Sequence, residues 1–309
     1  MSAHLKGCTP PPLGLILGMG MLLSATATAA VPPQEADGAG ALETVIVTAT
    51  RTSQDGDTLP SAWVALNEET ITRVAAQHSN QLFNRVSGAW VSRGNGQESL
   101  ISLRSPVLTG AGSCGAFMTA QDGISLRAPG FCNVNQLFDA NLLQAGAVEV
   151  LKGPAAVVFG SNALHGIINV ITRPVASTPR QLSIEAGSRD YYRLTASGGT
   201  QSVAVSAQTS RYGGYQADSG YKQHKATLRF DRSFSNWIID GALEASTLDQ
   251  ETAGYIQGYE AYKDEEASKE NPNPEAYRDA WSARGHLGFR GALMRRVSSP
   301  SAPTGAITA

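Results

Sequence analysis

From residue 180 to residue 290, apolar and polar side chains alternate in stretches of roughly ten residues. In one of them, Tyr192 and Leu194 alternate with Arg193 and Thr195. Successive side chains of a β-strand point to opposite faces, so each stretch predicts a strand with one apolar and one polar face. The sequence predicts about six consecutive strands of this kind, at QLSIEAG, YYRLTASG, SVAVSAQT, KATLRFDRSF, NWIIDGALEAS and WSARGHLGF.

The connections between these stretches alternate in length. GGT and SFSN are tight turns, whereas RYGGYQADSGYKQ and residues 249–279 are long and polar. Short turns on one side and long loops on the other are typical of a transmembrane β-barrel, in which one face of each strand meets lipid. A secreted β-sandwich with one solvated face fits the same alternation and is the alternative.

The first 56 residues are predicted to be an export signal and a linker. Lys6 precedes an apolar core at 13–23, and small residues at 25–30 suit cleavage, so residues 1–30 predict a signal peptide. An N-terminal membrane anchor is the alternative, but the apolar core is short for a membrane span. Residues 31–56 predict a flexible linker that contains an isolated β-prone patch, ETVIVTATR.

Residues 57–174 mix short helix and strand signals. Residues 67–74 predict a capped helix. Residues 79–91 predict a second short helix that runs into a strand. ESLISLRS predicts a strand, Asp122-Gly123 predicts a hairpin turn, and residues 136–153 predict a helix that runs into a strand.

The composition argues against several classes of function. The net charge of −2 leaves no polybasic surface for nucleic acid. GPAAVVFGS lacks the Gly-Lys-Ser/Thr ending of a phosphate loop, and no catalytic or metal-binding motif is present. We therefore expect no enzyme activity, no cofactor and no metal site.

Cys114 and Cys132 are the two cysteines that follow the predicted signal peptide. An even pair in an exported chain favours a disulfide, and two free thiols are the alternative. No Cys or His lies at metal-ligand spacing beside either of them.

The order of these parts, together with VEVLKGPAAVVFGSNALHGIINVIT at 148–172, resembles the TonB-dependent outer-membrane receptors. The resemblance implies an α+β plug domain at 57–174. An incomplete antiparallel transmembrane β-barrel of about six strands would follow at 180–290. It also implies a TonB box at 43–50, carried by Glu43, Thr44, Val45, Ile46, Val47, Thr48 and Ala49.

The plug motif comprises Lys152, Gly153, Pro154, Gly160 and Gly166, and each residue has a physical role. Lys152 ends a strand that Gly153-Pro154 interrupts, because proline has no N–H donor and fixes its own φ. Gly160 permits a turn that a side chain would resist, and Gly166 opens the buried strand GIINVIT. The chain departs from the family pattern at Leu164-His165-Gly166, where paired glycines are usual, and we expect His165 to be packed or hydrogen-bonded rather than a ligand.

A second departure is Arg104-Ser105-Pro106, where the family commonly has Arg-Gly. The resemblance places the following loop, and the loop that contains Cys132, at the extracellular apex of the plug. A disulfide there would hold the substrate-landing surface in one conformation. Arg104, Arg127 and Phe131 are candidates for substrate contact, and the alternative is that they only pack or solvate these loops.

The resemblance implies uptake of scarce chelated nutrients, such as ferric siderophores or cobalamin, across the outer membrane of a Gram-negative cell. The implied partners are TonB, the chelated metal or vitamin, and outer-membrane lipid. A plugged transporter has about 22 strands, so we expect a truncated product, with residues 291–309 as a tail outside the strand pattern. The alternative is a plug-containing fragment that binds without transporting, or an inert product.

Overall fold

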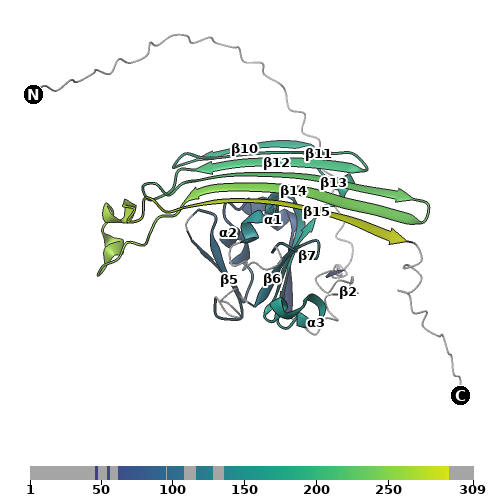
Figure 1. Cartoon of the computed structure of the whole chain (residues 1–309), viewed down its shortest axis with the longest axis horizontal. Coiled ribbons are helices and arrows are strands. Elements are labelled where there is room, and N and C mark those ends of the chain that lie inside the picture. Colours follow the sequence, from purple (N-terminus) through teal and green to yellow (C-terminus); the bar gives the residue numbers. More distant parts are fainter. Residues whose placement is uncertain are drawn as a thin grey trace, which may run out of the picture. The chain divides into compact units, whose positions relative to one another are not determined.

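The computed structural model of the chain describes residues 62–94, 96–107, 116–127 and 136–291, together with the two-residue strands β1 (Ile46–Val47) and β2 (Gln54–Asp55). These residues form an α/β unit at 62–172 and a six-stranded antiparallel sheet at 181–291, and Figure 1 labels the six strands of the sheet. No helix within the described ranges is long and apolar enough to cross a membrane.

The α/β unit is built on a five-stranded mixed sheet in the order β3-β8-β9-β6-β7. β8 and β9 are antiparallel, and β6 runs parallel to β9. β4 and β5 form a separate antiparallel hairpin. The strands are β3 (Ala62–Asn67), β4 (Ala89–Arg93), β5 (Ser99–Leu103), β6 (Phe117–Gln121), β7 (Ile124–Ser125), β8 (Ala145–Lys152) and β9 (Gly166–Thr172), and the helices are α1 (Glu68–Val74), α2 (Ser79–Phe83) and α3 (Ala156–Phe159).

Local sequence signals account for most of these elements. The Asn67 side chain accepts a hydrogen bond from the Thr70 N–H and caps α1, as predicted. Asp122 and Gly123 have φ of 49° and 78°, and they form the predicted hairpin turn between β6 and β7. The first five residues of β9 are buried, which matches the buried strand expected at GIINVIT.

Residues 136–144 differ from the predicted helix. They form two 3₁₀ turns, at Gln136–Asp139 and Leu142–Gln144. Asn141, between them, has φ −88° and ψ 76°, which lies outside the helical region. The predicted helix is therefore interrupted at Ala140 and Asn141, and β8 follows the second turn directly.

The six-stranded sheet pairs each strand with the next one along the chain. All six predicted strands are present: β10 (Gln181–Gly187), β11 (Tyr191–Gly199), β12 (Val203–Tyr212), β13 (Tyr221–Phe234), β14 (Trp237–Glu251) and β15 (Tyr277–Gly291). One face exposes large apolar side chains, among them Ile184, Val205 and Leu243. The other face buries polar side chains, among them Arg193, Gln223 and Gln250. This inverted distribution, with the apolar set outward, is the pattern of strands that face lipid.

The apolar cores of the two parts are separate. Eighteen buried side chains between Leu66 and Val170 form one cluster, and six between Met118 and Ile167 form another. The sheet contributes its own small cluster around Tyr221 and Leu248. None of these clusters mixes side chains of the two parts, so no shared apolar core joins them.

Candidate functional site

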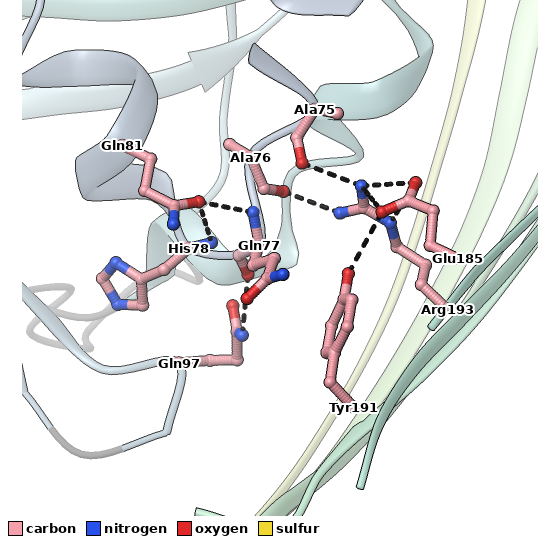
Figure 2. A network of polar contacts seen from close by, with 9 residues as sticks. All are labelled: Ala75, Ala76, Gln77, His78, Gln81, Gln97, Glu185, Tyr191 and Arg193. Atoms are coloured by element: carbon pink, nitrogen blue, oxygen red, sulfur yellow. Dashed lines mark hydrogen bonds and ion pairs between the residues drawn. The ribbon is translucent and has the colours of Figure 1, made fainter. Parts of the chain in front are cut away.

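Arg193 is the centre of a polar network that joins the sheet to the α/β unit (Figure 2). Its side chain is 3% exposed. One terminal nitrogen donates to the Ala76 carbonyl and the other to the Ala75 carbonyl, each at 2.8 Å. Ala75 ends α1 in a left-handed conformation, where helix carbonyls lack partners and carry partial negative charge. The guanidinium therefore caps the C-terminus of α1 from the sheet.

Glu185 holds the Arg193 guanidinium in position. The two residues are directly paired across β10 and β11. The carboxylate accepts from Arg193 Nε at 3.1 Å and from a terminal nitrogen at 2.7 Å. A forked pair of this kind fixes the plane of the guanidinium as well as its charge. Tyr191 donates a longer hydrogen bond of 3.4 Å to the same carboxylate.

The connection between α1 and α2 forms the second part of the network. The His78 ring caps α2 by accepting the Asn80 N–H at 3.1 Å, and its Nε2 lies 2.8 Å from the Glu98 carbonyl. The ring is therefore neutral, with its proton on Nε2, which donates to that carbonyl. Gln97 donates to the Gln77 carbonyl at 3.0 Å, and its own backbone N–H donates to Gln250 of β14 at 2.9 Å.

The burial of His78 makes the stability of the connection between α1 and α2 sensitive to acid. Burial is the main cause that lowers the pKa of His78 below its ordinary value of 6.5, and Arg93 acts in the same direction. The folded chain thus binds fewer protons than the unfolded chain, and stability is lost as the pH falls below 6.5. We expect the free energy of unfolding to fall by about 1 kcal/mol, the value of a cap, between about pH 7.5 and about pH 5. Urea unfolding of the full chain across this range measures it.

His78→Asn is the matched control for this pH dependence, because asparagine caps a helix equally well and does not titrate. The variant loses the hydrogen bond to the Glu98 carbonyl, so it should be less stable than the parent at neutral pH, and its stability should no longer decrease with acid. An unchanged decrease in His78→Asn would assign the effect to another group.

A third set of contacts fastens Asp139 and Ala140 to the sheet. Lys225 of β13 donates to the Ala140 carbonyl at 2.7 Å. Ser246 and Ser282 donate to one Asp139 carboxylate oxygen at 2.7 and 3.1 Å. Beside them, Arg284 and Glu244 form an ion pair of 2.7 Å, and Gln121 of β6 donates to the same Glu244.

The attachment between the two parts is therefore made of side-chain hydrogen bonds, together with an ion pair of 2.7 Å between Arg278 of β15 and Glu98. The two sheets share no strand pairing. A small cavity of about 30 Å³ lies between them, and His78, Gln97, Arg193, Gln208, Gln223 and Lys225 are among its lining residues. Polar contacts of this kind exchange with water at little net cost, so they suit a reversible attachment better than an apolar core would.

The plug-motif residues lie at the end of β8 and the start of β9. Lys152 donates to the Ser87 carbonyl at 2.8 Å, and burial together with Arg104 lowers the pKa of Lys152. β8 ends at Lys152, before Gly153-Pro154, as predicted. Gly160 has φ of 85°, consistent with the turn expected there. His165 is hydrogen-bonded through its backbone, to Ala116 and Gly153.

The substrate-contact candidates are not joined to one another among the described residues. The Arg104 N–H donates to the Gly88 carbonyl at the open end of the β4–β5 hairpin. The turn that contains Gln97 lies at the closed end of the same hairpin. The rise per residue of a strand places it roughly 17 Å from Arg104. Arg127 follows β7, and its N–H donates to the Ser125 hydroxyl. Phe131, Cys114 and Cys132 lie outside the described residues.

The predicted TonB box is described only at Ile46 and Val47. They pair antiparallel with Gln54–Asp55, as β1 with β2. Glu43, Thr44, Val45, Thr48 and Ala49 lie outside the described residues, as do residues 1–42 and 292–309. Within the described ranges, no group of three or more His, Cys, Asp or Glu side chains could hold a metal ion.

Comparison with known proteins identifies the α/β unit. Residues 55–167 match the family model of the TonB-dependent receptor plug domain. The chain is 28% identical over 184 residues to the vitamin B12 transporter BtuB of Vibrio cholerae serotype O1 (strain ATCC 39541 / Classical Ogawa 395 / O395). Residues 55–167 are therefore a TonB-dependent receptor plug domain. The α/β unit is this plug, and the six-stranded sheet has the fold of part of the barrel of the solved receptor FpvA.

Solved TonB-dependent receptors share this fold. FpvA of P. aeruginosa, bound to heterologous pyoverdines, superposes with a TM-score of 0.62 and 16% identity, over 78% of this chain and 33% of that one. The ferric yersiniabactin uptake receptor FyuA of Yersinia pestis superposes with a TM-score of 0.57 and 18% identity, over 75% and 38%. The match to the Vibrio transporter spans 58% of this chain and 28% of the transporter. The chain therefore corresponds to about a third of the length of its relatives.

Sequence reasoning did not identify the residues that join plug and sheet. Arg193 and Lys225 were recognised only as polar positions that alternate with apolar ones, and His78 and Asp139 carried no signal. A charged residue on the polar face of a barrel strand is a usable signal, because that face is turned toward the plug. Its partner is a backbone carbonyl that no sequence pattern marks.

Proposed function

We propose that the protein serves energy-dependent uptake of a chelated nutrient, such as a ferric siderophore or cobalamin, across the outer membrane. The observation that supports this best is the polar attachment of the plug. A plug with its own apolar core can leave or shift without unfolding the sheet, provided that the contacts between them are hydrogen bonds. An export signal at 1–30 and an apolar outer strand face fit an outer-membrane location.

The energy would enter through the segment that precedes the plug. TonB is the proposed partner, and residues 43–49 are the proposed contact. Ile46 and Val47 are β-branched and already extended in β1, so a strand of the partner could replace β2 as their neighbour. Tension on this segment would act on β3, the first plug strand, and then on the contacts made by Arg193 and Lys225. Substrate contact by Arg104, Arg127 and Phe131 remains part of this proposal.

Uptake by cells tests the proposal. The gene is expressed in a Gram-negative host without its own receptors, and accumulation of labelled cobalamin and of labelled ferric siderophores is measured with and without TonB. We expect Val47→Pro to reduce accumulation of the transported substrate to the level without TonB, because proline removes the N–H that a strand partner needs. The double variant Ile46→Val/Val47→Ile keeps both backbone N–H groups and should preserve accumulation of the substrate. TonB-independent accumulation, or none with any substrate, would contradict the proposal.

A further inference from the structure

Two polar cavities lie one after the other along the same face of the sheet. The first, here called the loop-side chamber, is the cavity lined by Arg193 of β11, Gln208 of β12 and Lys225 of β13. The second, the turn-side chamber, has a volume of about 20 Å³ and is lined by Ser197, Ser206 and Thr227 of the same three strands. In each strand the second residue lies closer to the short turns at 200–202 and 235–236. The chambers are therefore successive positions along one route.

A single plug segment separates the two chambers. Ala140 and Leu142 line the loop-side chamber, whereas Asn141 and Gln144 line the turn-side chamber. The segment is short. Its two 3₁₀ turns are separated by Ala140 and Asn141, so no continuous helix spans it. Its hydrogen bond to the sheet at the boundary is the one from Lys225 to the Ala140 carbonyl, at 2.7 Å. Lys225 is followed two residues later on the same face by Thr227, in the second chamber.

The turn-side chamber is lined with polar atoms that lack hydrogen-bond partners. Both side-chain atoms of Asn141 are buried without a partner in the protein, and so are Gln144 Nε2, Gln121 Oε1 and Ser206 Oγ. Asn141 and Gln121 are each 7% exposed. Buried polar groups are costly unless they are hydrogen-bonded, so this chamber favours a guest that both donates and accepts. Arg229 and Arg173 add cationic groups to the lining, and Arg173 is paired with Glu68 at 2.8 Å.

We infer that residues 140–144 are a partition between two chambers of one transit route, and that a polar solute rich in hydrogen-bond donors and acceptors passes when the Lys225–Ala140 bond opens. This inference rests on the proposed uptake function, since it names where the transported solute moves. The partition opens locally, and the Arg193 contacts at the end of α1 are not required to break. The route runs between the plug and strands β11, β12 and β13.

Thiol labelling of the purified full chain in detergent micelles tests the partition. Ser206→Cys places a thiol in the turn-side chamber, and methyl methanethiosulfonate serves as a small polar probe. The labelling rate is read by peptide mapping, which separates position 206 from the native cysteines. Lys225→Met keeps the length of the side chain and removes the donor, and it should raise the labelling rate about tenfold, as expected for loss of a charged hydrogen bond. Ala207→Cys, on the outward face, should react at a rate that Lys225→Met does not change.

Arg193→Met is the matched control, because it removes a different attachment of plug to sheet, at the end of α1. It should leave the labelling rate of Ser206→Cys within about twofold, since the two contacts do not share partners. An unchanged rate in Lys225→Met would overturn the inference, and so would fast labelling in the parent. An equal increase in Arg193→Met would show that the plug moves as one body. Labelling needs neither TonB nor substrate, so its failure is distinct from a failure of energised uptake.

Discussion

Replacement of Arg193 by methionine is expected to loosen the corner of the plug formed by α1 and α2. The change removes both hydrogen bonds to the end of α1 and the forked pair with Glu185. The Ala75 and Ala76 carbonyls and the carboxylate then lose a charged donor, which costs roughly 2–4 kcal/mol. Glu185 is about one-third exposed and recovers part of its hydration, so the cost should lie below that of a fully buried pair.

Hydrogen exchange of the full chain, followed by mass spectrometry, measures this loss. Amides in residues 75–81 should exchange roughly 30-fold to 1,000-fold faster, the factor that corresponds to 2–4 kcal/mol of local opening. Arg193→Lys should be intermediate, because lysine keeps the charge and cannot fork. Leu194→Met, on the outward face of the same strand, should change nothing. Unchanged exchange in Arg193→Met would mean that α1 is held by other contacts.

The elements of this chain follow from local sequence, and the attachment between its parts does not. Asn67 and the Asp122-Gly123 pair each act within three or four residues, so a pattern reveals them. The six sheet strands were visible because period-2 alternation is repeated six times. The Arg193 contacts join residues 117 and 118 positions apart and end on backbone carbonyls, which every residue has. Only the three-dimensional arrangement of α1 against β11 selects which carbonyls they are.

The same distinction applies to the plug motif. Its glycines signalled a turn and a break, and the structure agrees at Gly153 and Gly160. The sequence could not indicate that Gly166 lies against a neighbouring strand, because that requirement comes from the register of β8 with β9. A comparison of Gly166→Ala with Gly123→Ala separates the requirement for a positive φ from the requirement for space beside the backbone.

Gly166→Ala is expected to destabilise the plug strongly. Gly166 has φ of 145°, and a Cβ there would lie 2.2 Å from the Leu151 carbonyl oxygen and 3.2 Å from Leu103 Cδ1. Strand β9 is paired on both sides, with β8 and with β6, so neither neighbour can retreat without breaking a ladder. Backbone strain and overpacking together should cost roughly 2–5 kcal/mol.

Urea unfolding, followed by the fluorescence of Trp63 and Trp90, measures the stability of the plug in the full chain. Trp237 and Trp281 belong to the sheet and are exposed, so both can be changed to phenylalanine to isolate the plug signal. Gly123→Ala is the matched control: its φ is 78°, but no atom lies within 4 Å of the added Cβ. It should cost only the backbone strain, about 1–2 kcal/mol. Equal losses at the two positions would show that the β8–β9 contact yields to a methyl group and that φ alone selects glycine at position 166.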